Sequence, residues 1–278
     1  MADEYTLYNG VRVPAIGYGT YLTDKAITED CVLRALETGY RHIDTAAFYG
    51  NERETGNAVR RSGLRREEVF VTSKLWATDR GYKKALAAFD RTVSELGLGA
   101  PDLYLIHWPE SPSRTPDWEK INLETWQALT ELYEAGKVRA IGVSNFLPHH
   151  LDALIKTKVP PMTNQIEFNP GVKQPETTAY CKEHGLLVEA WSPLGRGRML
   201  GGERLAAVAR KYGITVAQLC IAWCLARGTL PLPKTTDTAR MRENFAAASV
   251  KLSGKDVSYI NSLPPFGAGG RHPDINGF

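Results

Sequence analysis

Short strand-like runs alternate with longer helical stretches along most of this chain. The strand-like runs lie at 15–17, 42–44, 69–73, 103–106, 140–143, 163–167, 187–190 and 230–233. Helical periodicity lies between them, for example at 29–37, 81–96, 121–135 and 204–211. Strand-like runs that alternate with helical stretches are typical of a parallel sheet. The pattern predicts an α/β protein, a (β/α)8 barrel of the TIM type.

The first 14 residues depart from this alternation. Two short runs, 5–8 and 11–13, flank Asn9-Gly10, and Asn-Gly between alternating runs is a strong hairpin signal. We expect an N-terminal β-hairpin at 1–14 that closes the bottom of the barrel. We also expect a single domain over 1–278, because no linker divides the chain, with a C-terminal tail at 264–278 over the active-site face.

A doubly wound open sheet is the alternative architecture. Such a sheet normally carries a glycine-rich fingerprint after its first strand. Gly17-Tyr18-Gly19-Thr20 lacks the third glycine, and Leu200 stands where the glycine after Gly195-Arg196-Gly197 is needed. The barrel therefore fits the sequence better.

Composition and charge narrow the class of function. With 43% hydrophobic residues and a net charge of +3, the chain is expected to be globular rather than disordered. The 34 basic and 31 acidic residues are mixed, which predicts neither a nucleic-acid nor a membrane-surface partner. An acidic start and scattered cysteines favour a cytoplasmic protein without a metal site; the cysteines are Cys31, Cys181, Cys220 and Cys224.

Three neighbouring predicted strands each end in an ionisable side chain. Asp44 ends the second strand, Lys74 the third and His107 the fourth, while Tyr49 follows Asp44 in the next loop. The carboxyl ends of barrel strands form the active-site rim, so these side chains are expected to converge. Taken singly, Asp44 and Lys74 could form a structural ion pair, and His107 could be a packed core residue. The convergence of these side chains at one rim favours a functional site.

The four residue types suit the protonation of an oxygen atom. A tyrosine hydroxyl titrates at about 10, and we expect the Lys74 cation to stabilise its phenolate. Asp44 would hold Lys74 protonated, and a neutral His107 would donate a hydrogen bond to a carbonyl oxygen. This set serves a carbonyl that becomes an alkoxide when hydride reaches its carbon.

Several motifs resemble those of the aldo-keto reductases. They are GYRHIDTA at 39–46, YGNE at 49–52, KLW at 74–76, DLYLIHWP at 102–109, IGVSNF at 141–146 and NQIE at 164–167. A last motif near the end of the chain comprises Pro233-Lys234, Arg240, Glu243 and Asn244. They span nearly the whole chain, and the likeness is greatest to short prokaryotic members such as diketogluconate reductases. The resemblance implies an NADPH-dependent reductase with the catalytic residues Asp44, Tyr49, Lys74 and His107, in which Tyr49 is the general acid.

The resemblance also implies a binding site for NADPH/NADP+. It places the nicotinamide ring against Trp191 and the carboxamide at Ser144, Asn145 and Gln165. Further cofactor contacts are implied for Gly19, Thr20, Tyr21, Asp44, Ser192, Pro193, Leu194 and Gly195, and the adenosine end is assigned to Lys234, Thr235, Arg240, Glu243 and Asn244. A lysine, a hydroxyl and an arginine near a helix start suit the 2′-phosphate, so we expect NADPH to be preferred over NADH.

The substrate pocket is expected to be aromatic. Its implied lining is Tyr21, Tyr49, Trp76, His107 and Trp108, covered by a loop at 109–118. A short tail favours broad acceptance of small carbonyl substrates by a monomer. Two alternatives stay open: a barrel that acts as a cofactor-binding sensor or interaction module, and an isomerase or lyase that forms a Schiff base on Lys74.

Overall fold

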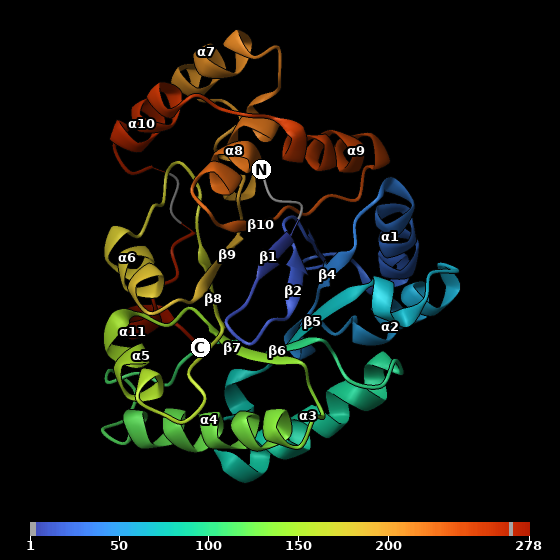
Figure 1. Cartoon of the computed structure of the whole chain (residues 1–278), viewed down its shortest axis with the longest axis vertical. Helices are drawn as coiled ribbons and strands as arrows, with labels where there is room; N and C mark the ends of the chain where they lie inside the picture. Colours follow the sequence, from blue (N-terminus) through green and yellow to red (C-terminus); the bar gives the residue numbers. More distant parts are fainter. Residues whose placement is uncertain (1–3, 267–268) are drawn as a thin grey trace.

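Eight parallel strands form the barrel in this computed structural model, which describes residues 4–266 and 269–278 (Figure 1). In spatial order the strands are β3 (Tyr18–Gly19), β4 (His42–Asp44), β5 (Phe70–Leu75), β6 (Leu103–Ile106), β7 (Ala140–Ser144), β8 (Thr163–Glu167), β9 (Leu187–Trp191) and β10 (Leu230–Leu232). The first and last strands meet, because the Gly17 and Gly19 N–H groups donate to the carbonyls of Pro231 and Pro233 at 3.0 and 3.1 Å. The predicted (β/α)8 fold is confirmed.

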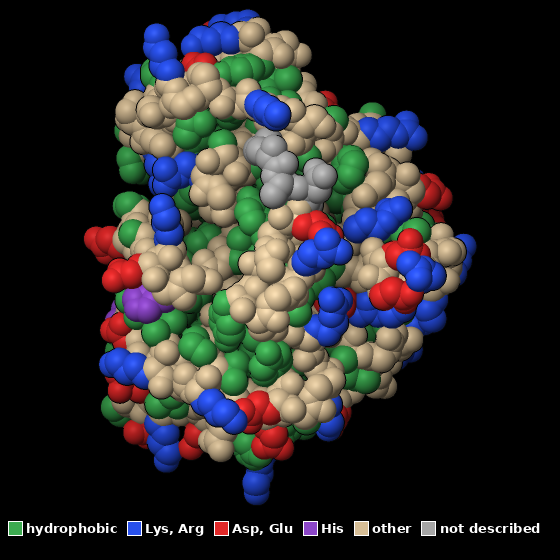
Figure 2. Space-filling view, in the orientation of Figure 1, with side chains coloured by type: hydrophobic (Ala, Val, Ile, Leu, Met, Phe, Trp, Pro, Cys, Tyr) green, Lys and Arg blue, Asp and Glu red, His purple; other side chains and the backbone are tan. Residues whose placement is uncertain are grey.

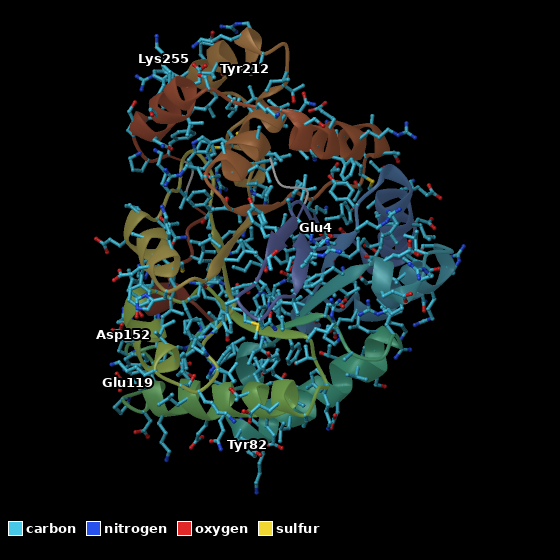
Figure 3. The ribbon with its side chains drawn as sticks, in the orientation of Figure 1. Glu4, Tyr82, Glu119, Asp152, Tyr212 and Lys255 are labelled. Carbon is cyan, nitrogen blue, oxygen red and sulfur yellow. The ribbon has the colours of Figure 1, made fainter. Side chains whose placement is uncertain are left out.

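Helices surround this barrel, as Figure 1 shows. They are α1 (Lys25–Thr38), α2 (Glu52–Arg61), α3 (Tyr82–Leu96), α4 (Trp118–Glu134), α5 (Pro148–Ile155), α6 (Pro175–Glu183), α7 (Glu203–Lys211), α8 (Val216–Ala226), α9 (Thr238–Ala246), α10 (Gly254–Ser262) and α11 (Pro273–Asn276). At one end of the molecule the last residue of α7 and the residue after it are joined to α10. Asp256 there accepts hydrogen bonds from Lys211 and Tyr212, both at 2.7 Å, and Figure 3 labels Tyr212.

An antiparallel pair, β1 (Glu4–Thr6) and β2 (Arg12–Pro14), forms the expected N-terminal hairpin. Gly10 adopts a φ of +86° in its turn, a conformation that glycine reaches without steric penalty. The Tyr5 hydroxyl donates to the carbonyl of Thr229, which directly precedes β10. The hairpin therefore lies at the amino-terminal ends of the barrel strands, in front in Figure 1.

The first barrel strand lies later in the chain than the apolar pattern predicts. The prediction was 15–17, whereas pairing with β4 begins at Tyr18, opposite Ile43. Ala15 and Ile16 precede the strand and are buried in the core. They are apolar because they are buried, not because they pair in the sheet.

Basic and acidic side chains are interspersed on the face seen in Figure 2. Among the described residues, no single helix is long and apolar enough to cross a membrane, although the sharply bent pair α7 and α8 passes that test jointly by length and composition.

Candidate active site

A cavity of about 750 Å³ opens at the carboxyl ends of the barrel strands. Most of the predicted site residues line it: Gly19, Tyr21, Asp44, Tyr49, Trp76, His107, Trp108, Asn145, Gln165, Trp191, Ser192, Pro193, Leu194, Lys234, Thr235, Arg240, Glu243 and Asn244. Predicted site residues from Gly19 to Asn244, far apart in the sequence, thus line one cavity. The cavity is concave, large and mixed in polarity, as small-molecule sites usually are.

A buried ion pair lies behind the floor of the cavity. Lys74 is fully buried on β5, and its Nζ donates to both carboxylate oxygens of Asp44, at 2.7 and 2.8 Å. A third bond, of 2.9 Å, reaches the carbonyl of Thr45. These bonds compensate the loss of hydration that burial imposes on both charges. The three bonds occupy the donors of Nζ, which does not favour a Schiff base on Lys74.

Tyr49 ends a short 3-10 turn, Ala47–Tyr49, that directs its ring into the cavity. Its hydroxyl is 3.3 Å from Lys74 Nζ. Burial, together with the charge of Asp44 and the neighbouring Tyr21, raises the pKa of Tyr49 well above its usual value of 10. Lys74 gives its shorter bonds to Asp44 and Thr45, and its contact with Tyr49 is longer. Tyr49 is therefore a protonated phenol at neutral pH.

His107 follows β6 and faces Tyr49. The two rings meet edge-on with centroids 5.5 Å apart, and Trp76 packs edge-on at 5.2 Å from the imidazole. Burial and the nearby Lys74 charge lower the pKa of His107 well below its usual value of 6.5. The imidazole is therefore neutral, with one ring N–H to donate.

The residues expected at the nicotinamide end are joined by hydrogen bonds. Trp191 Nε1 donates to Asn145 Oδ1 at 2.8 Å, and Asn145 Nδ2 donates to the carbonyl of His107 at 2.9 Å. Gln165 Nε2 lies 2.8 Å from Asp44 Oδ2 and 2.8 Å from Glu189 Oε2. An aromatic ring and side-chain amides thus border the proton-donating groups, an arrangement that fits a flat amide-bearing ring.

The far end of the cavity carries positive charge. Lys234 and Arg240 line it with Thr235, and the first turn of α9 is capped by Asp237, which accepts from the Arg240 backbone N–H at 2.9 Å. Two cations and a hydroxyl beside a helix start suit a phosphate group. The cavity therefore fits a dinucleotide with an additional phosphate at this end.

Four predicted residues do not line the cavity: Thr20, Lys74, Ser144 and Gly195. Thr20 and Ser144 are buried, and their hydroxyls donate to the backbone carbonyls of Asp44 and Gln165 at 3.1 and 2.7 Å. These hydrogen bonds hold the ends of β4 and β8 in place.

Other lining residues were missed from the sequence: Leu22, Phe48, Arg196, Gly197, Leu200, Thr215, Val216, Ala217, Leu232, Pro233, Gly269, Arg271 and Phe278. Phe48 directly precedes Tyr49 in the sequence, and that position was a usable signal. Phe278 had none: it is the last residue, and its ring packs 4.6 Å from Trp76 with the Arg271 guanidinium 4.1 Å above it.

The loop at 109–118 does not cover the cavity, contrary to the sequence-based expectation, since none of its residues lines it. Glu110 forms an ion pair with Arg80 at 3.0 Å, and its backbone N–H and carbonyl both bind the Asn122 side chain. The loop is thereby fastened to α4, and the C-terminal tail supplies the aromatic wall instead.

Backbone strain is concentrated at this cavity. Five described residues other than glycine have a left-handed φ: Leu22, Asn145, Gln174, Ser192 and Arg196. All of them except Gln174 line the cavity. Such conformations persist where the surrounding structure enforces them, often at ligand sites.

Fold and site together define a (β/α)8-barrel oxidoreductase with a dinucleotide-sized cavity. A model of the Aldo/keto reductase family matches residues 15–264, and the chain belongs to this family. It is 46% identical over 263 residues to 9,11-endoperoxide prostaglandin H2 reductase of Trypanosoma cruzi, covering 93% of this chain and 90% of that protein. It is 41% identical over 276 residues to glyoxal reductase of Bacillus subtilis, covering 99% and 97%.

Solved structures agree with this assignment. An aldo-keto reductase from a deep-sea metagenome superposes with a TM-score of 0.93 at 39% identity, covering 99% of this chain and 100% of that one. The Bombyx mori aldo-keto reductase in complex with NADP superposes with a TM-score of 0.85 at 33% identity, covering 94% and 92%.

Proposed function

We propose that this chain reduces an aldehyde, ketone or dicarbonyl with hydride from NADPH, and that Tyr49 gives the proton to the carbonyl oxygen. Its family makes the chain an NADP(H)-dependent oxidoreductase, and the Bombyx mori relative was solved with NADP. One observation carries the finer proposal. A tyrosine that burial keeps protonated faces the cavity beside a neutral His107, with its hydroxyl 3.3 Å from Lys74 Nζ.

The cavity residues divide into two binding regions for the cofactor, which supplies hydride when it is bound. Trp191, Asn145 and Gln165 orient the nicotinamide end. Lys234, Thr235 and Arg240 hold the 2′-phosphate at the other end, with Glu243 and Asn244 at the adenine. Both regions line the same cavity, which supports a single extended ligand.

Residues at the carboxyl ends of β4 and the neighbouring strands carry out the proton transfer. A ring N–H of His107 donates to the substrate oxygen and orients it. As hydride reaches the carbonyl carbon, the Tyr49 O–H proton passes to that oxygen, and an alcohol is formed. The Lys74 ammonium, 3.3 Å away, then stabilises the phenolate that remains until water reprotonates it. Asp44 keeps Lys74 in position.

The substrate pocket is walled by aromatic rings. Trp76 stacks on Phe48 with centroids 3.7 Å apart, and Trp108 and Phe278 complete that side. Flat or small carbonyl compounds fit such walls, so we expect turnover of aromatic aldehydes and dicarbonyls. We further propose a cytoplasmic monomer; the four cysteines are buried and unpaired, as in proteins of reducing compartments.

Following NADPH oxidation with a carbonyl panel tests the reaction class. We expect consumption of NADPH with an aromatic aldehyde and a dicarbonyl, formation of the matching alcohols, and no consumption without a carbonyl. Tight NADPH binding without turnover of any carbonyl would contradict the reductase and favour the sensor alternative. Light scattering of the same sample tests the monomer.

A further inference from the structure

Glu189 is a fully buried carboxylate directly beneath the nicotinamide end of the proposed cofactor site. It lies on β9, in register with Gln165 on β8, so that both side chains point the same way. Glu189 does not line the cavity, whereas Gln165 does. The Glu189 carboxylate therefore acts on the cavity only through its neighbour.

One atom of Gln165 contacts two carboxylates. Nε2 lies 2.8 Å from Glu189 Oε2 and 2.8 Å from Asp44 Oδ2. A carboxylate oxygen only accepts hydrogen bonds, so the amide atom between two of them is the NH2 group. Both amide protons are used in this way. The carbonyl oxygen, Oε1, has no hydrogen-bond donor among the residues that the structure describes, and Gln165 lines the cavity.

Asp44 alone fixes the amide less firmly. Its Oδ2 also accepts from Lys74 at 2.8 Å, so Asp44 shares this oxygen between two donors. Glu189 Oε2 has Gln165 as its donor, and it supplies the second anchor that prevents rotation of the amide. Losing that anchor leaves an amide proton unpaired in a buried place, which favours other rotamers.

We propose that Glu189 is a positioning residue for the cofactor: it holds the Gln165 amide with Oε1 toward the cavity, where Oε1 accepts from the carboxamide NH2 of the nicotinamide. This inference rests on the proposed function. Burial raises the pKa of Glu189 to about 7, so both protonation states are populated near neutrality. Oε2 accepts in either state, because a protonated acid carries its proton on the other oxygen. A glutamine at this position therefore retains the anchor.

The test compares two probes in full-length protein. NADP+ contacts both ends of the site, whereas adenosine 2′,5′-bisphosphate lacks the nicotinamide and reports only the Arg240 end. Glu189→Met is expected to weaken NADP+ binding roughly tenfold, the loss of one well-placed hydrogen bond, and to leave the bisphosphate unchanged. Glu189→Gln is expected to bind NADP+ within about twofold of the natural chain.

Controls separate positioning from structural damage. Glu52→Met removes another buried carboxyl, one bonded to Ser73 at 2.5 Å and outside the cavity lining, and is expected to change neither affinity. Adding Glu189→Met to Gln165→Leu is expected to weaken NADP+ binding no further than Gln165→Leu alone. If Glu189→Met does not fold, Glu189→Asp, one methylene shorter, makes the same comparison.

Two results would overturn the inference: unchanged NADP+ affinity in Glu189→Met or Glu189→Asp, or an equal loss for both probes. Failure of the proposed function is distinct from both. In that case the natural chain does not bind NADP+, or Gln165→Leu binds it as well as the natural chain does.

Discussion

The Lys74 ammonium is the buried charge that organises the site. Its three short bonds go to Asp44 and to the carbonyl of Thr45, and its longer contact goes to Tyr49. Removing Asp44 leaves this charge unpaired, which costs about 3–5 kcal/mol of folding stability. An inactive Asp44 variant would therefore report on folding as much as on chemistry. Tyr49 is the cleaner probe, because its hydroxyl can be removed with the ion pair intact.

The sequence identified these side chains by their positions at strand ends, and the structure brings them into contact. It did not reveal the direction in which the pKa of Tyr49 moves. That direction depends first on burial of Tyr49 in the folded site, and then on the charge of Asp44 and the neighbouring Tyr21. Burial arises from long-range packing, which a pattern of residue types does not show.

Arg240→Ala is expected to lower the NADPH preference. The variant removes a cation from the phosphate end of the cavity, so the ratio of kcat/KM for NADPH to that for NADH should fall roughly tenfold or more, the value of a charge-assisted hydrogen bond. Steady-state kinetics with both cofactors measure it. Arg242→Ala, at an exposed neighbouring position outside the cavity, is the matched control. An unchanged ratio in Arg240→Ala would show that the phosphate does not bind there.

Strands and helices followed from hydrophobic periodicity, whereas the loops and the tail did not. The run at 103–106, Leu-Tyr-Leu-Ile, coincides with β6, because a parallel strand buried on both faces is apolar throughout. The tail instead depends on long-range contacts. Gly269 N–H donates to Glu167 at 2.9 Å, and Asp274 lies 3.0 Å from His150 and 3.3 Å from His149. A local sequence pattern cannot predict such partners, because they are more than 100 residues away in the chain.

Phe278→Ala is expected to weaken substrate binding selectively. The variant removes an aromatic wall that packs on Trp76 and Trp108, so KM for an aromatic aldehyde should rise roughly threefold to tenfold, while the Kd of NADPH stays unchanged. Tyr259→Ala, on α10, removes an aromatic residue that is 43% exposed and outside the cavity, and serves as the control. An unchanged KM would remove Phe278 from the substrate site.

Closure of the barrel places a positively charged cavity directly above buried ionisable side chains. The net charge of +3 describes the average surface, whereas Arg196, Lys234 and Arg240 concentrate positive charge along the cavity. Beneath it, the packed interior buries Lys74 and Glu189 fully, and Asp44 lies between them and the cavity that it lines. The sequence predicted this architecture through its eight strand-like runs. It could not predict which interior carboxyl would resist ionisation, since that depends on the packing of the whole barrel.

Glu189 is expected to make folding stability depend on pH. Its pKa is about 7 in the fold and 4.5 ordinarily, so between these values the folded state binds the extra proton and rising pH favours unfolding. The natural chain should therefore lose about 3 kcal/mol relative to Glu189→Gln as pH rises from about 4.5 to above 7. Urea unfolding at both ends of this range measures it, with Glu119→Gln as the exposed control (Figure 3). A difference that does not change with pH would contradict the buried acid.

Tyr49→Phe tests the central claim most directly. With NADPH bound beforehand, a single turnover of an aromatic aldehyde is followed in the variant and in the natural chain. Loss of the phenolic proton should slow reduction roughly 1,000-fold, while the Kd of NADPH stays within about twofold, because the ring and the Lys74–Asp44 pair remain. Reduction at a near-normal rate by Tyr49→Phe would contradict the assignment of Tyr49 as the proton donor.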